Sequence, residues 1–373
     1  MHSTVQHRTG RDAARVNPDL DKLYPYPFTR LRALLADIEV SSAAPHISLA
    51  IGEPQHPPPG FVERALVSEL ASLQRYPAVQ GSAALRAAIG DWLARRYAIE
   101  RTAIDDQHMV LPVQGTREAL FAAAQFIVDR GIVNSDKAEQ SRPAPPLVMM
   151  PAPFYQIYEG AALMAGAAPH YMPGTAAQGF IADLDAVTPA AWQRCQLLYV
   201  CNPSNPTGVV LDSGYYQQLL ELADRYDFVI ASDECYSEIY PDEQRPCTGL
   251  LQACAERGRL DFARCLVFNS LSKRSNLAGL RSGFVAGDAA LIKAFLLYRT
   301  YHGSAMPAHH QAASIAAWSD EQHVRDNRAQ YRAKLNAVTG ELRGVLDFVA
   351  PAGGFCLWTQ TPVDDPQFAA GLY

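Results

Sequence analysis

The sequence predicts an α/β protein with a mostly parallel sheet that helices cover on both faces. Short apolar runs alternate with amphipathic helical segments between about residues 109 and 300, which is the pattern of repeated strand–helix units. Most of these runs are continuously apolar, as expected for strands buried on both faces. Ligands of such sheets bind at the carboxyl ends of the strands.

Length and composition indicate an enzyme-like globular chain. Its 373 residues suffice for one large and one small domain, and 49% hydrophobic with 19% charged residues is ordinary for such proteins. A net charge of −6 argues against nucleic acid or an anionic membrane as the main partner. No run is apolar and long enough to span a bilayer. Residues 1–16 lack the apolar core of a secretory signal and are predicted to be a disordered extension.

The seven cysteines are scattered, and none forms a C-x-x-C pair. Several stand in apolar runs, where cysteine behaves as a small hydrophobic residue. Their odd number and spacing argue against a disulfide framework and favour a reducing, cytoplasmic location.

Residues 17–60 are predicted to form an N-terminal arm and part of a small domain. The proline-stiffened residues 24–27 would pack on a partner subunit or wrap their own domain. A helical pattern covers residues 28–40, and residues 47–51 are predicted as a strand that ends at Gly52. A glycine there permits close approach of a ligand, or simply makes a turn.

Six apolar runs are predicted as strands of the sheet: residues 109–113, 147–150, 197–200, 228–231, 265–269 and 283–286. Residues that could bind a ligand follow the carboxyl ends of the first five predicted strands. They are Gly115, Thr116, Tyr155, Asn202, Asp233, Tyr236 and Lys273. Because parallel strands end at one edge of a sheet, these residues are expected to lie close together.

A single lysine follows the strand at residues 265–269. Lys273 stands among small polar residues, with Ser270 and Ser272 before it and Arg281 eight positions later. A lysine is a nucleophile only when its amine is neutral, so its surroundings must lower its proton affinity. Arginine binds anions in a bidentate way. The stretch favours a Schiff base between Lys273 and a carbonyl cofactor whose phosphate Arg281 and Ser272 bind; the alternative is an ordinary surface loop.

Two turns extend this hypothesis. Gly115 and Thr116 link a strand to a helix start, where free backbone N–H groups can bind an anion, although a tight turn also favours glycine. Asp233 ends an apolar run, and a buried carboxylate there needs a cation such as a protonated pyridine nitrogen, or it caps the next turn. Asn202 and Tyr236 could donate to a phenolate oxygen, and Asn202 could equally serve turn formation.

Other catalytic signatures are missing from the sequence. It has no G-x-G-x-x-G after a strand, no phosphate-binding loop of the G-x-x-x-x-G-K type, no H-E-x-x-H and no G-x-S-x-G. The adjacent His309 and His310 would face different sides of a helix, which argues against a metal pair.

Four segments resemble the motifs of the class I/II pyridoxal-phosphate aminotransferases of fold type I. They are residues 202–208 (NPSNPTG), 233–236 (DECY), 270–273 (SLSK) and 279–283 (GLRSG), in the family's order and spacing. The resemblance extends from residue 17 onward. It implies a large cofactor-binding domain at residues 61–302 and a smaller α/β domain, of which residues 303–373 form an incomplete part.

The resemblance also implies roles for single residues. Lys273 would bind pyridoxal phosphate and move the substrate's proton, Asp233 would pair with the pyridine nitrogen, and Tyr155 would stack on the ring. Asn202 and Tyr236 would bind the phenolic oxygen, and Gly52 would lie beside the substrate carboxylate. The phosphate would be bound by Gly115, Thr116, Ser270, Ser272, Arg281 and, across the interface of a homodimer, the partner subunit's Tyr76.

Within the family, the chain most resembles the proteobacterial succinyldiaminopimelate aminotransferases of lysine biosynthesis, through residues 17–28, 272–276 and 302–307. The implied reaction takes the amino group of glutamate to N-succinyl-2-amino-6-oxopimelate. A general aspartate, alanine or aromatic aminotransferase is the alternative within the family. Because family members continue beyond a position like Tyr373 to an arginine that binds the substrate α-carboxylate, an incomplete small domain is expected, and an inactive cofactor-binding form is the third alternative.

Overall fold

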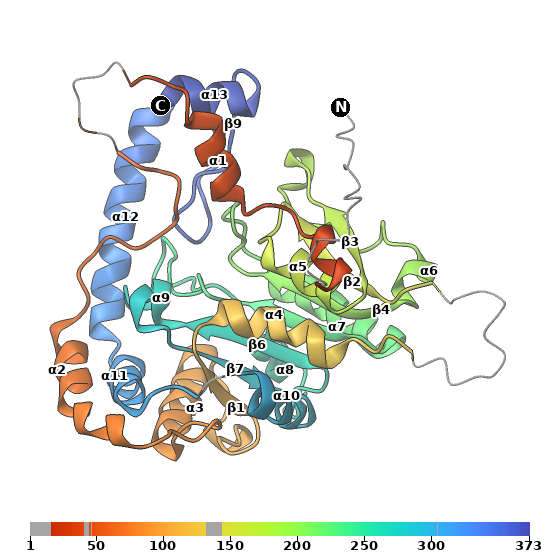
Figure 1. Ribbon diagram of the computed structural model, residues 1–373, viewed down its shortest axis with the longest axis vertical. Coiled ribbons are helices and arrows are strands. Elements are labelled where there is room, and N and C mark those ends of the chain that lie inside the picture. Colours follow the sequence, from red (N-terminus) through yellow and green to blue (C-terminus); the bar gives the residue numbers. More distant parts are fainter. Residues whose placement is uncertain (1–15, 41–44, 46, 132–143, 304) are drawn as a thin grey trace.

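The structure of the protein is a computed structural model, which describes residues 16–40, 45, 47–131, 144–303 and 305–373. The disordered extension predicted for residues 1–16 lies outside the described residues, except for its last residue. The α/β class predicted from the sequence is confirmed, with one large sheet at the centre of the molecule (Figure 1).

The central sheet has seven strands in the described part of the chain, in the order β1-β7-β6-β5-β4-β2-β3. Only β7 runs antiparallel to its neighbours, β1 and β6; the other pairs are parallel. The strands are β1 (Val110–Val113), β2 (Leu147–Ala152), β3 (Ala168–Pro173), β4 (Cys195–Cys201), β5 (Val229–Asp233), β6 (Cys265–Ser270) and β7 (Gly283–Gly287). The carboxyl ends of β1, β2, β4, β5 and β6 therefore meet at one edge.

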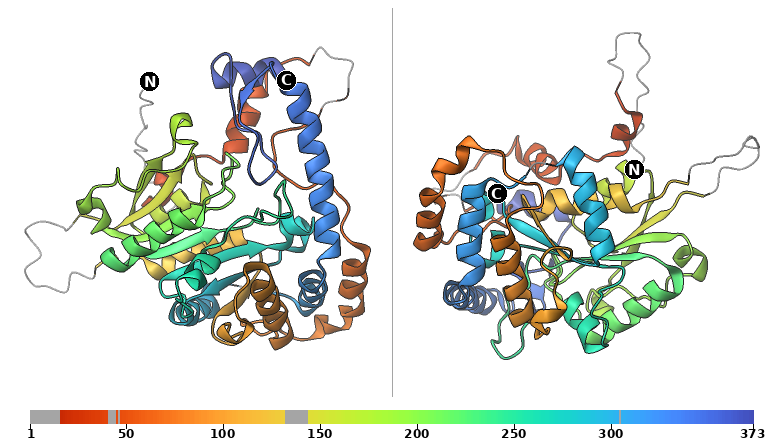
Figure 2. Two further views of the ribbon diagram at one scale, coloured as in Figure 1. Left: turned by 180° about the vertical axis from the view of Figure 1, so that it is seen from behind. Right: turned by 90° about the horizontal axis from the view of Figure 1, so that it is seen from below.

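Successive side chains of the buried strands enter two different hydrophobic cores. Along β4, for example, Leu198 contributes to one core and Tyr199 to the other. Because each strand is buried on both faces, helices must cover both, and Figure 2 shows the sheet between two helical layers. One layer holds α3 (Ala83–Tyr97), α7 (Ser213–Tyr226), α8 (Leu250–Glu256) and α11 (Ala308–Ser319); the other holds α4 (Thr116–Ile127), α5 (Ile157–Met164) and α10 (Ala289–His302).

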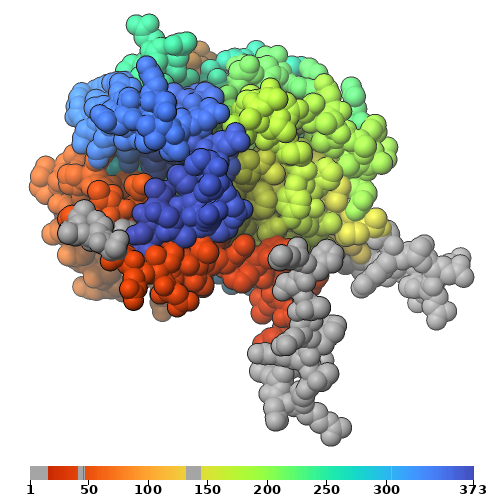
Figure 3. Space-filling view, turned by 90° about the horizontal axis from the view of Figure 1, so that it is seen from above, coloured from red at the N-terminus to blue at the C-terminus, as the bar shows by residue number. Residues whose placement is uncertain are grey.

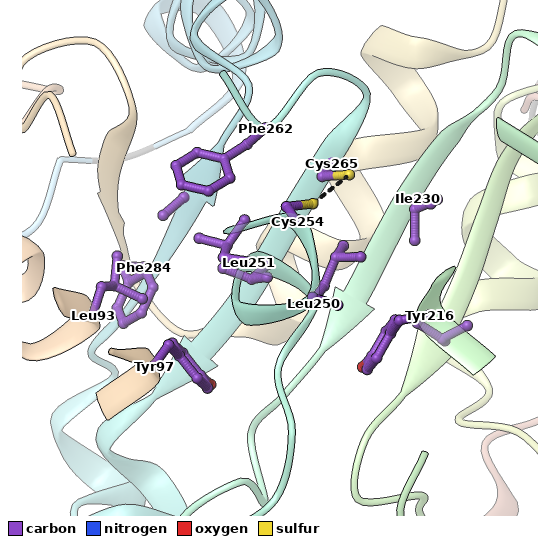
Figure 4. Close-up of a cluster of buried hydrophobic side chains, with 14 of the residues drawn as sticks. Leu93, Tyr97, Tyr216, Ile230, Leu250, Leu251, Cys254, Phe262, Cys265 and Phe284 are labelled. Carbon is purple, nitrogen blue, oxygen red and sulfur yellow. Dashed lines mark hydrogen bonds between the residues drawn. The ribbon is translucent and has the colours of Figure 1, made fainter. Parts of the chain in front are cut away.

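The first core includes a pair of buried thiols between α8 and β6 (Figure 4). Cys254 donates to Cys265 with 3.6 Å between the sulfurs, and aliphatic and aromatic side chains enclose both. All seven cysteines are free, as the sequence predicted.

The N- and C-terminal parts gather beside the carboxyl edge of the sheet. Helix α12 (Gln322–Leu342) runs along one side of the molecule, and α1 (Pro27–Leu35) lies near α13 (Asp365–Leu372) (Figures 1 and 3). A short hairpin of β8 (Asp347–Phe348) and β9 (Thr359–Gln360) accompanies them. The remaining elements are α2 (Gly60–Ser68), α6 (Pro189–Trp192), α9 (Leu271–Arg274) and five 3₁₀ segments (Pro18–Lys22, Leu70–Gln74, Arg101–Ala103, Ala176–Gln178 and Ala278–Leu280).

One local prediction is wrong. Residues 47–51 form no strand, and Ile47, Leu49 and Ile51 are exposed. Their apolar pattern predicted a strand, but no described strand pairs with this segment, so its backbone has no ladder to join. Near the C-terminus, residues 353 and 354 donate their backbone N–H groups to Gly208 and Ile239, and β9 begins at Thr359.

No helix in the described part of the chain is long and apolar enough to cross a membrane.

Candidate active site

The predicted site residues assemble at the carboxyl edge of the sheet. Cys201 of β4 pairs with Asp233 of β5, and Asp233 pairs with Phe268 of β6. The strand ends are thereby held in register, and each side chain that follows them is placed relative to its neighbours. Lys273, which follows β6 on α9, joins the same edge.

The amine of Lys273 is partly buried in aromatic surroundings. It donates to the carbonyl oxygen of Gly52, and it lies 5.7 Å from the ring centroid of Tyr236 and 5.4 Å from that of Phe355. It forms no ion pair within 4 Å in the described part of the chain. Burial lowers the pKa of Lys273 below its ordinary value, which increases the neutral, nucleophilic fraction.

Asp233 is a buried carboxylate that forms no ion pair with any residue the structure describes. It accepts a hydrogen bond from the hydroxyl of Tyr158 at 2.8 Å and one from the backbone N–H of Cys235 at 3.2 Å. Burial raises the pKa of Asp233 above its ordinary value, although both hydrogen bonds oppose the rise. A positively charged partner would therefore be stabilised beside this side chain.

A strand–turn–helix connection places free N–H groups next to an arginine. Gly115 adopts φ +92° immediately before α4, and the free backbone N–H groups at this helix start carry a partial positive charge. A Cβ on Gly115 would overlap the guanidinium of Arg281. Arg281 is exposed, adopts φ +54° and donates only to the carbonyl of Ala278 among the described contacts. The turn and the arginine together can bind a multivalent anion.

Hydroxyl groups line the same turn. Thr116 Oγ1 lies 3.0 Å from the sulfur of Cys235, and the hydroxyl of the buried Ser270 donates to that sulfur at 3.7 Å. Ser272 is half-buried in the first turn of α9. Thr116 and Ser270 therefore both contact Cys235, a residue that the sequence did not single out.

Tyr155 is held by a second arginine. Its hydroxyl accepts from Arg117 Nε at 2.7 Å, and its ring packs edge-on against Tyr158 at 5.8 Å. Tyr158 in turn donates to Asp233. Tyr155 thus lies in the group around Asp233, where the sequence placed it.

Asn202 and Tyr236 lie close to the site, but they differ in whether their polar groups already have partners in the protein. Asn202 is buried, and its amide donates to the carbonyl of Thr248 at 2.7 Å and accepts from the N–H of Leu211 at 2.9 Å. This amide therefore already ties two loops together. Burial raises the pKa of Tyr236 well above its ordinary value, so its phenol stays a proton donor.

Gly52 reaches the site although its predicted strand does not form. A Cβ on Gly52 would stand 3.3 Å from the ring of Phe355 and 4.0 Å from the hydroxyl of Tyr236. Tyr76, by contrast, is fully exposed. Its predicted place, in the site of a partner subunit, stays a prediction.

The sequence reasoning missed several contributors. Phe355 and Cys356 line a small hollow together with Tyr236 and the loop at residues 204–208. The signal for Phe355 was the Gly353–Gly354 turn before it, which lets the chain bend back onto this loop. Tyr158 and Arg117 carried no signal, because a tyrosine or an arginine on a helix is ordinary on its own.

Comparison with known proteins agrees with this geometry. The family model described as "Aminotransferase class I and II" matches residues 44–373. The chain belongs to the class I and II aminotransferases. It is 31% identical over 353 residues to an LL-diaminopimelate aminotransferase of Desulforudis audaxviator, an alignment that covers 93% of this chain and 84% of the relative.

Solved aminotransferase structures are similar over most of the chain. An aminotransferase from Neisseria meningitidis has a TM-score of 0.87 at 45% identity and covers 96% of this chain and 87% of its own. The aminotransferase AspB from Helicobacter pylori has a TM-score of 0.83 at 35% identity, with coverages of 94% and 87%. The family resemblance and the fold type predicted from the sequence are confirmed.

Aminotransferases of this family use pyridoxal phosphate as their cofactor and act on amino and keto acids. The residues at the edge of the sheet fit that group in three respects. Asp233 is a buried carboxylate with no cation beside it among the described residues, Lys273 is an amine whose pKa burial lowers, and the Gly115 turn beside Arg281 offers N–H and guanidinium donors to a phosphate.

Proposed function

We propose that this aminotransferase acts in diaminopimelate and lysine biosynthesis. The reaction proposed takes the amino group of glutamate to N-succinyl-2-amino-6-oxopimelate, which yields 2-oxoglutarate and N-succinyl-LL-2,6-diaminopimelate, and is reversible. The observation that carries transamination is the partly buried Lys273 amine, which lies at the same edge of the sheet as the buried carboxylate of Asp233, whose hydrogen-bond donors among the described residues are uncharged. The substrate is supported by residues 272–276 and 302–307 of the sequence.

The cofactor would be held by residues from five strand ends. When bound, pyridoxal phosphate supplies an aldehyde for amines and a ring that withdraws electrons from the adjacent carbon. Asp233 would hold a proton on the ring nitrogen, and Tyr236 would donate to the phenolic oxygen. Asn202 would donate to the same oxygen after its amide nitrogen releases the carbonyl of Leu211, the longer of its two bonds. Tyr155 would stack on the ring. The phosphate would be bound by Gly115, Thr116, Ser270, Ser272, Arg281 and the partner subunit's Tyr76.

Lys273 would have two roles. Its amine would hold the cofactor between reactions. Once the amino donor has displaced it, the amine would move a proton between the substrate α-carbon and the cofactor. Both roles need a neutral amine near neutral pH, which the lowered pKa of Lys273 supports. Gly52 would leave room for the substrate carboxylate, since a Cβ there would crowd Phe355.

The larger organisation is proposed on the same basis. Residues 61–302 would form the cofactor-binding domain, and residues 17–60 with 303–373 would form the small domain. Two copies would share their active sites in a homodimer, which would cover the exposed apolar side chains of Ile47, Leu49 and Tyr76. The free thiols support a cytoplasmic location.

The first half of the reaction tests the proposal. Purified protein loaded with pyridoxal phosphate is mixed with L-glutamate, without an acceptor, and 2-oxoglutarate is measured together with the cofactor's absorbance. About one equivalent of 2-oxoglutarate per bound cofactor is expected, with conversion of the cofactor to its amine form. If neither appears, the protein is not an active aminotransferase toward glutamate.

A second substrate is favoured by the relatives, which are named LL-diaminopimelate aminotransferases at 31% and 30% identity. The amine-loaded protein discriminates between the candidates when offered a panel of keto acids in single turnovers. Faster reaction with the N-succinylated keto acid supports the first proposal. Faster reaction of the aldehyde-loaded protein with free LL-diaminopimelate than with its N-succinyl form supports the second, and preference for oxaloacetate or pyruvate would indicate a general aminotransferase.

A further inference from the structure

Lys273 stands on a helix that cannot position it unaided. Helix α9 is only four residues long, from Leu271 to Arg274. A helix of this length is not stable in isolation, and the carbonyl groups of its last turn have no partners within the helix. The place of Lys273 is therefore set by the groups that bind this last turn.

One asparagine of the long helix α12 supplies those groups. The amide nitrogen of Asn327 donates to the carbonyl oxygens of Lys273 and of Arg274, both at 3.3 Å. Asn327 is buried, with 3% of its surface exposed. Its amide oxygen accepts from His56 Nδ1 at 2.9 Å and from Asn276 Nδ2 at 3.0 Å. All four hydrogen-bonding positions of this amide are thus used, and the opposite orientation would bring its oxygen against two carbonyl oxygens.

The histidine fixes a second segment to the same asparagine. Because His56 Nδ1 donates to Asn327, its Nε2 is an acceptor, and the ammonium group of Lys334 donates to it at 2.7 Å. The ring of His56 also packs against Tyr331 of α12 at 4.8 Å. Residues 52–56 are therefore attached to α12 at one end.

The other end of this segment meets the lysine side chain. The carbonyl of Gly52 accepts from the amine of Lys273. The contacts close a ring: Lys273 side chain to Gly52, chain to His56, His56 to Asn327, and Asn327 to the main chain of Lys273. Both the backbone and the amine of Lys273 are held by this one ring.

We propose that Asn327 and His56 are positioning residues for Lys273, which fix its main chain and the Gly52 carbonyl relative to each other so that the amine is presented to the cofactor. The inference rests on the proposed role of Lys273 in binding pyridoxal phosphate. Asn327 acts through the backbone of Lys273 and does not itself touch the substrate or the cofactor.

A substitution that changes only the amide group of Asn327 tests this ring of contacts. Asn327→Asp keeps the size of the side chain and the acceptor for His56, but it sets a carboxylate oxygen against the carbonyls of Lys273 and Arg274. Asn336→Asp, at an exposed asparagine of the same helix, introduces the same charge elsewhere and is the matched control. Two measurements are made. The first is the rate at which folded apoprotein captures pyridoxal phosphate covalently, trapped with borohydride. The second is the pH midpoint of the absorbance change of the cofactor-loaded protein.

Capture by Asn327→Asp is expected to be about tenfold slower than in the wild type, with the pH midpoint moved by about one unit, because both hydrogen bonds from the amide nitrogen to the main chain of α9 are lost. Asn336→Asp should stay within about twofold with an unchanged midpoint. Wild-type rate and midpoint in a folded Asn327→Asp protein would overturn the inference.

A second pair of variants, at His56, tests the inference even if Asn327→Asp does not fold. His56→Asn preserves a donor near the position of Nδ1, whereas His56→Leu removes it. Slower capture in His56→Leu with recovery in His56→Asn supports the inference; equal behaviour of the two variants overturns it. If the wild type itself captures no pyridoxal phosphate on Lys273, the proposed function fails. If the wild type captures it and the variants capture it equally well, only the positioning role fails.

Discussion

Asp233 is a buried acid whose described partners are uncharged donors. Tyr158 and the backbone of Cys235 stabilise its anion, yet burial still raises its pKa. An arrangement of this kind costs stability when the site is empty and is relieved when a cation arrives. Asp233 is thus better explained as half of an ion pair with a ligand than as a turn cap.

Asp233→Asn separates these two explanations. The unfolding free energy of the apoprotein should be unchanged or higher by up to about 1 kcal/mol, because a costly buried charge is removed. The increase in Tm caused by pyridoxal phosphate should become smaller. Thermal denaturation with and without cofactor measures both quantities. Asp261→Asn is the control, since Asp261 is exposed and also accepts from the N–H two residues later, at 3.2 Å; a cofactor effect equal in both variants would contradict the ion-pair role.

Gly115→Ala tests the phosphate turn. The new Cβ would overlap Arg281, and φ +92° is unfavourable for alanine. We expect at least a tenfold rise in the Kd of pyridoxal phosphate, measured by absorbance titration. Gly179→Ala, at φ +60° with nothing within 4 Å of the new methyl group, should leave this Kd within about twofold. Equal affinities in wild type and Gly115→Ala would show that the phosphate binds elsewhere.

At the scale of elements, α3, the segment after β5 and α12 are joined by one buried acid. Glu238 pairs with Arg96 of α3 at 2.5 Å and with Arg328 of α12 at 3.2 Å. The ring of Tyr240 lies 4.4 Å from the Arg328 guanidinium. Burial would raise the pKa of Glu238, but Arg96, Arg274 and Arg328 outweigh it and hold the pKa below the ordinary value of 4.5.

Glu238→Gln should therefore destabilise the protein in a pH-dependent way. Loss of the charge leaves the buried Arg96 without its carboxylate partner, whereas Arg328 keeps Glu243. The unpaired buried charge costs about 3 kcal/mol near neutral pH. Because the pKa of Glu238 is lower in the folded state, its contribution is full above about pH 4.5 and is lost as the pH falls further. Urea unfolding at pH 7 and at pH 4 should show the variant's deficit shrinking on acidification. Glu221→Gln, which breaks an exposed pair with Arg257, should cost less than about 1 kcal/mol at both values.

The elements of the sheet were predictable because their signal is local. Strands β4, β5 and β6 are continuous apolar runs, and Lys273, Asp233 and Asn202 follow them at family spacing. Residues 47–51 show the limit of that signal, since the same apolar pattern stands in an exposed segment without a pairing strand. Strand β3 was not predicted from the sequence, because most of its side chains are only partly buried and two of its six residues are prolines. Asn327 and His56 could not be found, because they meet only through a contact 271 residues apart in the sequence.

At the scale of the whole molecule, the proposed homodimer makes a prediction about Tyr76. If this side chain completes the site of the other subunit, variants Tyr76→Ala and Lys273→Ala should complement each other. In a mixed dimer, one site combines the intact Lys273 with an intact Tyr76 and regains activity, at up to half the wild-type value per dimer. Activity is measured after the two variants are unfolded together and refolded. No recovery in verified mixed dimers would place Tyr76 outside the partner's site.

The central claim is that the Lys273 amine binds pyridoxal phosphate covalently, and peptide mapping after reduction tests it most directly. Protein loaded with the cofactor is treated with borohydride, digested and examined by mass spectrometry. The predicted result is one pyridoxyl phosphate group per chain, on the peptide that contains Lys273, and no label in Lys273→Ala. A label on another lysine, or an unlabelled wild type that nevertheless transaminates, would contradict the account.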